Sequence, residues 1–144
     1  MESFPAPDPG ELGYTILTDV LVGESSHVRV LARQAVVFNS CIALRLELVR
    51  APGSSTETWW KESRAAARQR NIISDTPAAV DLAGGFRLEI VEGTRLVARD
   101  GARGSEDRLV VDYVVEKPKA AQVCVLRVQW PDFGIHDAQL TIPV

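Results

Sequence analysis

The chain has 144 residues, of which 46% are hydrophobic and 24% are charged, as in ordinary globular proteins. This length fits one domain with a core large enough to need no disulfide or metal. The formal net charge of −3 argues against a surface built for nucleic acid or anionic lipid, because such binding relies on clustered cations. No apolar run reaches the ~18 residues of a membrane-spanning helix.

The first twelve residues hold three prolines and three acidic residues but little apolar content. This composition predicts a flexible Pro-rich arm over residues 1–12 and a single domain over residues 13–144. The start of the chain also lacks the basic and apolar regions of a signal peptide, so we expect a cytoplasmic protein.

Alternation with a period of two dominates the domain and is typical of strands with one buried face. Even positions are apolar from Val28 to Ala32, at Val36 and Phe38, and again from Ile42 to Leu48, although the alternation blurs after Ala32. If Asn39 and Ser40 form a hairpin turn, this constant parity requires a loop of odd length. The alternative is one long bent strand. The predicted core positions are Val28, Val30, Ala32, Val36, Phe38, Ile42, Leu44, Leu46 and Leu48.

Further strands follow the same rule around positions 14–22, 109–115, 124–130 and 138–142. A turn at residues 92–94 would pair a strand over 86–90 with one that carries Leu96 and Ala98. The loop over residues 100–107 has oxygen-bearing side chains, but its spacing favours a hairpin tip over a calcium site. About eight strands predict a mostly β protein, an antiparallel two-sheet sandwich of the immunoglobulin-like or a related Greek-key type.

One segment breaks the alternation and predicts an inserted α-helix at about 55–71. Ser54 and Glu57 fit a capping box, and Ala65, Ala66 and Ala67 are strong helix formers. A single helix without a second βα unit does not indicate a parallel sheet, so we expect a flap over an end or edge of the sandwich. Residues 74–85 are predicted to form a long connecting loop.

Cys41 and Cys124 are the two cysteines. Cys124 shares parity with Leu126, Val128 and Trp130, whereas Cys41 is out of phase with its apolar neighbours. The two side chains should therefore not face one core, and we expect free thiols.

No catalytic, metal or cofactor site emerges from the sequence. His27 and His136 stand far apart, without His or Cys at ligand spacing. Cys124 and His136 would make a thiol–imidazole pair only if strands brought them together, but a thiol in a core is usually inert. We therefore expect a protein that is not an enzyme.

Two aromatic stretches are the weak candidates for binding. Trp59 and Trp60 at the start of the predicted helix either seal the sandwich or anchor a partner, with Arg64 and Arg68 on the same helix to engage an acidic group. Trp130 and Phe133 flank a turn formed around Pro131 and Gly134. These two rings pack over the sandwich end unless they are exposed together, in which case they form a binding patch.

The function we expect is that of a non-enzymatic protein–protein interaction module, self-association included. Its partner would be another protein or a second copy, docked on an edge strand or on the helical flap. The alternative is a small-molecule-binding β domain in which the helix covers an apolar pocket.

Overall fold

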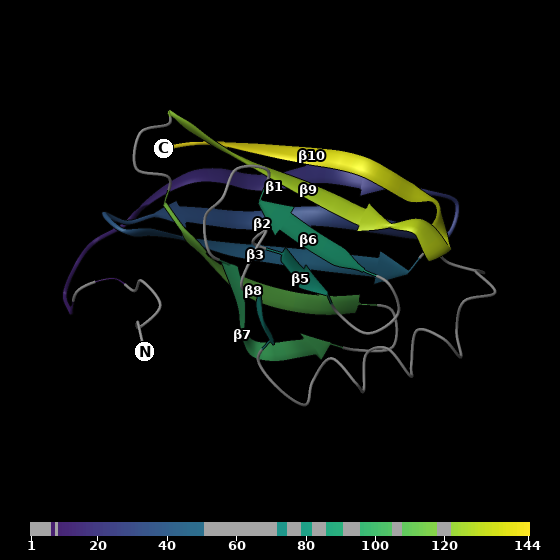
Figure 1. The fold of residues 1–144 in the computed structure, drawn as a ribbon, viewed down its shortest axis with the longest axis horizontal. Coiled ribbons are helices and arrows are strands. Elements are labelled where there is room, and N and C mark those ends of the chain that lie inside the picture. Colours follow the sequence, from purple (N-terminus) through teal and green to yellow (C-terminus); the bar gives the residue numbers. More distant parts are fainter. Residues whose placement is uncertain are drawn as a thin grey trace.

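Strands account for most of the chain that can be described. The computed structural model describes residues 7, 9–50, 72–74, 79–81, 86–90, 96–104, 108–117 and 122–144. Within these ranges ten strands form two sheets in which every pairing is antiparallel (Figure 1). The prediction of an antiparallel two-sheet β fold is confirmed.

The larger sheet has six strands in the order β1-β2-β3-β8-β7-β4. The first three strands are neighbours in sequence and follow one another as hairpins. The strands of this sheet are β1 (Tyr14–Glu24), β2 (Val28–Val37), β3 (Cys41–Arg50), β8 (Arg108–Glu116), β7 (Leu96–Gly104) and β4 (Ile72–Ser74).

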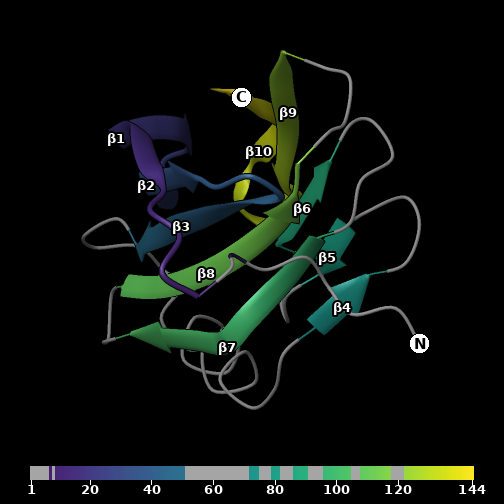
Figure 2. The ribbon, with the colours of Figure 1, turned by 90° about the vertical axis from the view of Figure 1, so that its left-hand side faces the viewer.

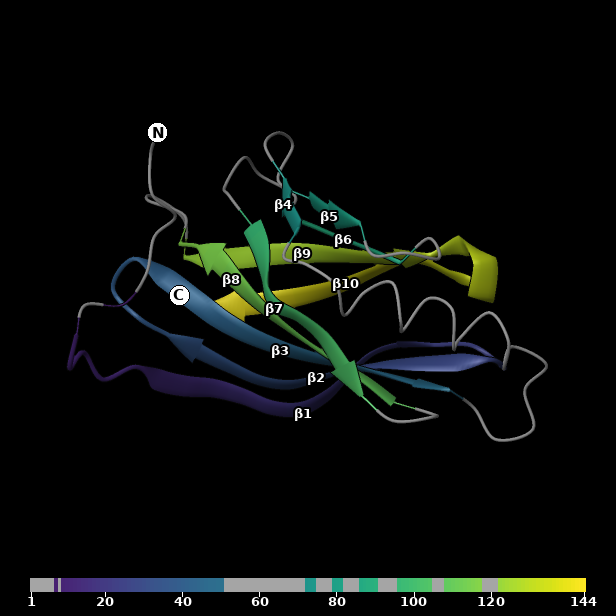
Figure 3. The same cartoon turned by 90° about the horizontal axis from the view of Figure 1, so that it is seen from below.

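The smaller sheet has four strands in the order β10-β9-β6-β5. Figures 2 and 3 show this sheet as a second layer that faces the larger one. Edge strand β1 contacts edge strand β10, so the two sheets meet along one side. The strands of the smaller sheet are β10 (Ile135–Pro143), β9 (Val123–Trp130), β6 (Arg87–Ile90) and β5 (Ala79–Asp81).

The core lies between the layers, because alternate side chains of both sheets point inward. Trp130 of β9 is its largest buried side chain and meets Phe86 edge to face at 5.2 Å between ring centroids. The alternation expected for β3, β8 and β9 is confirmed. Besides Trp130, the core-facing buried positions of these strands are Ile42, Leu44, Leu46, Leu48, Leu109, Val111, Tyr113, Val115, Cys124, Leu126 and Val128.

The parity expected for β2 is wrong in its second half. Val28, Val30 and Ala32 are buried as expected, but the next core residues are Ala35 and Val37 rather than Val36 and Phe38. The cause is a β-bulge, since the register between β2 and β3 shifts between Ala32 and Gln34. One extra residue moves every later side chain to the other face of the sheet.

Because of the same bulge, the turn between β2 and β3 also differs from the expected one. Val37 pairs with Ile42, and the Phe38 N–H donates to the Cys41 carbonyl at 2.9 Å, so Asn39 and Ser40 form a two-residue connection. Residues of opposite parity face each other across this turn. The odd-length loop and the single bent strand are therefore both wrong.

The predicted hairpin between β6 and β7 is also wrong. β6 pairs with β5 and β9, whereas Leu96 and Ala98 of β7 pair with Val115 and Tyr113 of β8 in the other sheet. The chain thus crosses between the sheets after β6. Period-two alternation identifies the positions that face the core. Because both sheets contribute to the same core, the alternation does not tell which sheet a strand belongs to.

The described residues form ten strands rather than the eight expected, because β4 ends at the start of the stretch predicted as a loop over residues 74–85 and β5 lies within that stretch. β7 pairs with β8, but β7 extends to Gly104, so residues 100–104 of the predicted hairpin tip belong to a strand, and residues 105–107 lie outside the described residues. The predicted helix at 55–71 lies outside the described residues, and so does most of the arm over residues 1–12.

Neither cysteine forms a disulfide, and both are buried. Cys124 belongs to the main core, whereas Cys41 packs on the opposite side of the larger sheet with Val114 and Phe38. The prediction that the two thiols do not share a core is confirmed.

Candidate interaction surface

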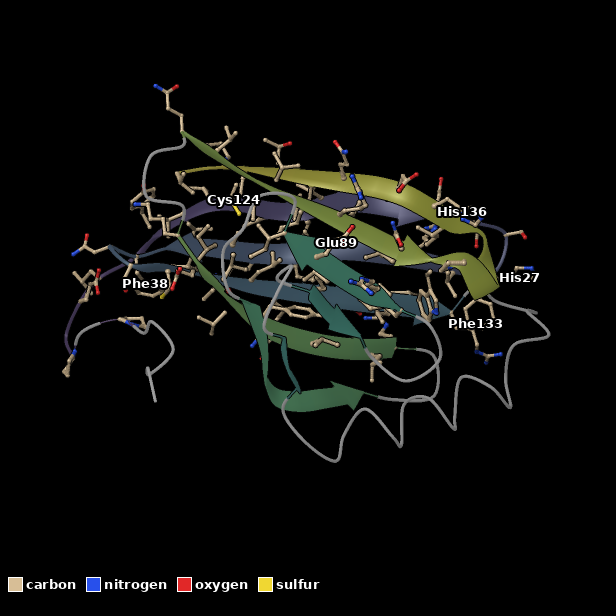
Figure 4. All side chains as sticks on the ribbon, in the orientation of Figure 1. His27, Phe38, Glu89, Cys124, Phe133 and His136 are labelled. Carbon is tan, nitrogen blue, oxygen red and sulfur yellow. The ribbon has the colours of Figure 1, made fainter. Side chains whose placement is uncertain are left out.

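The structure does not bring Cys124 and His136 together. Cys124 of β9 lies opposite Ile142, six residues along β10 from His136, which is a separation of about 20 Å. Figure 4 shows these two labelled residues far apart along the sandwich. Burial also raises the pKa of the Cys124 thiol to about 11. This cysteine is therefore a core residue and not an activated nucleophile.

Trp130 and Phe133 are both buried, with 2% and 7% of their surface exposed. Their rings pack at 5.1 Å between centroids around the 3-10 turn η1 (Pro131–Phe133), and Gly134 closes the turn with a φ of 81°. The predicted hairpin with aromatic flanks over the sandwich end is confirmed. Joint exposure, the condition for a binding patch here, is not met.

The other predicted binding residues, Trp59, Trp60, Arg64 and Arg68, lie outside the described residues. Among the residues that the structure describes, no group of three or more His, Cys, Asp or Glu side chains is arranged to hold a metal ion. None of the described helices is long and apolar enough to cross a membrane.

The most prominent surface feature is an apolar strip along edge strand β1. We define the apolar strip as Leu12, Tyr14, Val20 and Leu21, which are 94%, 56%, 38% and 49% exposed. Across the described residues, one further large hydrophobic side chain is exposed, Val123 at the start of β9. Exposed apolar residues therefore lie along one edge, with Tyr14 and Val20 on the core-facing side of β1 and Leu21 on its outward side, and exposed apolar side chains are typical of contact surfaces.

The strip is exposed because β1 is the outermost strand of the larger sheet. Gly23 lies close to β10, where an added Cβ would stand 3.1 Å from the Ala138 Cβ. Tyr14 and Val20 lie opposite the core residues Val37 and Ala32 of β2, so they belong to the core-facing side of the sheet. Their exposure shows that the smaller sheet does not fully cover this side of β1.

The charged side chains of β1 are paired within the sheet. Asp19 contacts Arg33 at 3.0 Å, and Glu24 contacts Arg29 at 3.2 Å, both on β2. An approaching partner therefore meets apolar side chains without an unpaired charge on this strand. The β1 edge therefore suits a partner whose contact surface is uncharged and largely apolar.

The backbone of β1 is less suited to pairing with another strand. Its register shifts at Ile16 and at Val22, and Asp19 has a φ of 52°. Bulges and left-handed residues interrupt the row of free backbone groups on an edge strand. The exposed side chains, rather than the backbone, are thus the distinctive feature of the β1 edge.

A hollow of about 300 Å³ lies on the outward side of the larger sheet. Val36, Ala43 and Val114 lie directly opposite one another on β2, β3 and β8, and the small Ala43 lowers the floor between the two valines. Arg45 and Asp112 form an ion pair beside this floor. The hollow is lined by Gln34, Val36, Ala43, Leu44, Arg45, Asp112, Tyr113 and Val114.

Sequence reasoning identified neither the apolar strip nor the hollow. Six of the nine residues from 14 to 22 are apolar or aromatic, so their composition indicates a buried strand. Edge position depends on strand order, which no local pattern encodes. The contrast between Ala43 and its larger neighbours was visible in the sequence, but the hollow requires the pairing of three strands.

Comparisons with known proteins do not indicate a family or a function for this chain. No protein-family model matches the chain, and no curated protein and no solved structure is detectably similar to it.

Proposed function

We propose that this protein is a non-enzymatic protein–protein interaction module, self-association included, and that it docks its partner on the apolar strip of β1. The observation that carries the proposal is the gathering of Leu12, Tyr14, Val20 and Leu21 on one edge. Tyrosine with aliphatic neighbours is a composition typical of the centre of protein interfaces.

The pairing of Asp19 and Glu24 within the sheet supports the same proposal. Because these charges are already compensated, burial of the strip leaves no isolated carboxylate behind. The partner that fits is an apolar protein surface with a polar rim.

A small-molecule-binding domain is the second candidate. The hydroxyl of Tyr113, in the core, is buried and has no hydrogen-bond partner among the described residues. Burial raises the pKa of this hydroxyl, so it stays a neutral donor. A ligand held between the sheets would satisfy that donor, as a buried water would.

Two finer assignments belong to the same proposal. The immunoglobulin-like class is supported by two facing antiparallel sheets with chain crossings between them. A cytoplasmic location is supported by two buried thiols that are not joined in a disulfide.

The proposal is tested by affinity capture from an extract of the source organism, with variants that place a charge on the strip. Val20→Glu and Leu21→Glu change exposed positions, so both variants should fold like the wild type. We expect the captured protein, or a second copy, to be lost from both.

The matched control is Val123→Glu, which changes an exposed valine on the other sheet. This variant should retain the partner. Equal capture by all four proteins would show that the strip is not the docking surface.

A further inference from the structure

The outward hollow of the larger sheet has the features of an anchoring pocket for one side chain. Its volume of about 300 Å³ is at the lower end of the range for ligand pockets. Val36, Ala43 and Val114 supply an apolar floor. An occupant must therefore be small and mainly apolar where it meets this floor.

The rim of the hollow selects against a charged occupant. The Arg45 Nε donates to Asp112 Oδ1 at 2.7 Å, and the Arg45 Nη2 donates to Oδ2 at 3.3 Å. This bidentate pair cancels the charge of the guanidinium. The exposed amide of Gln34 adds a neutral donor and acceptor. The chemistry fits an uncharged side chain with an apolar body and a polar tip.

Tyr14 has these properties and is presented on the same molecule. It is 56% exposed, and its backbone is fixed in β1 opposite Val37. A tyrosine ring loses little conformational entropy on binding, and its hydroxyl both donates and accepts hydrogen bonds.

The chain before Tyr14 is also fixed. The Glu11 carboxylate accepts the Asn39 N–H at 2.7 Å. Gly13 lies so close to Val36 that an added Cβ would be 2.5 Å from the Val36 Cγ1. Leu12, between these two anchored residues, nevertheless remains 94% exposed. The apolar side chain beside Tyr14 is thus held outward.

We propose that the hollow binds the Tyr14 side chain of a second copy of this chain, with Leu12 packing beside it. This inference rests on the proposed function and names its partner. Tyr14 is on the core-facing side of the larger sheet and the hollow is on the outward side. The contact therefore joins two different surfaces and is heterologous, so that copies add head to tail.

The test removes each half of the contact separately. Tyr14→Ala removes the inserted ring, whereas Ala43→Phe fills the floor of the hollow. Sedimentation velocity should show that the wild type grows beyond a dimer with concentration, and that each variant has an association constant at least about 10-fold weaker. Gln34→Trp, at the exposed rim, is a second blocking variant in case Ala43→Phe does not fold. Val123→Ala, on the other sheet, should associate like the wild type.

A mixture of the two kinds of variant gives the sharpest outcome. Tyr14→Ala retains its hollow and the blocked variant retains its tyrosine, so the mixture can form one contact and should stop at a dimer. A monomeric mixture of folded variants would overturn the proposal.

The failure of this inference is distinguishable from that of the proposed function. A wild type that stays monomeric to about 1 mM excludes self-association of useful strength. If that monomer still binds another protein and loses it in Val20→Glu, the interaction module stands and the tyrosine contact between copies is wrong.

Discussion

Glu47 of β3 is the one charged residue that is buried among those whose side chains the structure describes, with 6% of its surface exposed. Its carboxylate accepts from Arg33 Nε at 2.5 Å and lies 3.4 Å from Arg108 Nη1. Hydrogen bonding to Glu47, and then to Asp19, raises the pKa of Arg33. A row of alternating charges therefore crosses β1, β2, β3 and β8 on the outward side of the larger sheet.

Replacement of Glu47 should cost stability because two arginines lose a buried partner. We expect Glu47→Ala to lower the free energy of unfolding by about 1–3 kcal/mol in urea denaturation. Glu24→Ala is the control, since its ion pair with Arg29 is exposed. That variant should change stability by less than about 1 kcal/mol. Equal losses in the two variants would contradict the role assigned to Glu47.

Cys124 should make stability depend on pH in the alkaline range. Burial raises the pKa of its thiol from about 9 in the unfolded chain to about 11 in the folded protein. The unfolded state loses its proton first, so the stability from this group is complete below pH 9 and is lost as the pH rises towards 11. Urea midpoints measured from pH 8 to 11 should fall less steeply for Cys124→Ala. If the urea midpoint fell equally steeply with pH in the variant and the wild type, Cys124 would not be the cause of the loss of stability.

At the scale of elements, the sequence predicts core-facing positions well wherever a strand is regular. The alternation of β3, β8 and β9 is as expected, and Pro131 and Gly134 mark the turn before β10 correctly. The prediction fails in β2, where a bulge next to Arg33 reverses the parity. No residue type in that segment specifies a bulge, because its cause is the pairing with two neighbouring strands.

Edge strands β1 and β10 share a backbone irregularity that the sequence does not reveal. Asp19 of β1 and Asp137 of β10 each have a φ of 52°. Aspartate adopts this conformation more readily than most residues, and it interrupts an edge that would otherwise be regular.

A pair of variants at Asp137 isolates the cost of this conformation. Both Asp137→Gly and Asp137→Ala remove the carboxylate that contacts Gln129 and Arg127. Glycine accepts a positive φ without the steric cost that alanine has, so Asp137→Gly should be more stable by about 1 kcal/mol. Thermal or urea unfolding measures the difference. An alanine variant as stable as the glycine variant would show that the strand relaxes to a regular form.

At the scale of the whole molecule, strand order decides what the surface offers. Residues 14–22 are apolar enough for a central strand, yet β1 lies at an edge and Tyr14, Val20 and Leu21 are exposed. The hollow beside Ala43 likewise exists only once β2, β3 and β8 are aligned. A single sequence encodes such long-range pairing weakly, which is why it predicts the core but not the candidate interaction surface.

The central claim, that the protein acts by binding other protein chains, is tested most directly by native mass spectrometry of the freshly purified 144-residue chain. The interaction module predicts masses that are multiples of the 15.7 kDa chain or that include a second protein. Val20→Glu should reduce these species. A single chain that carries only a small-molecule mass would contradict the interaction module and favour the ligand-binding domain.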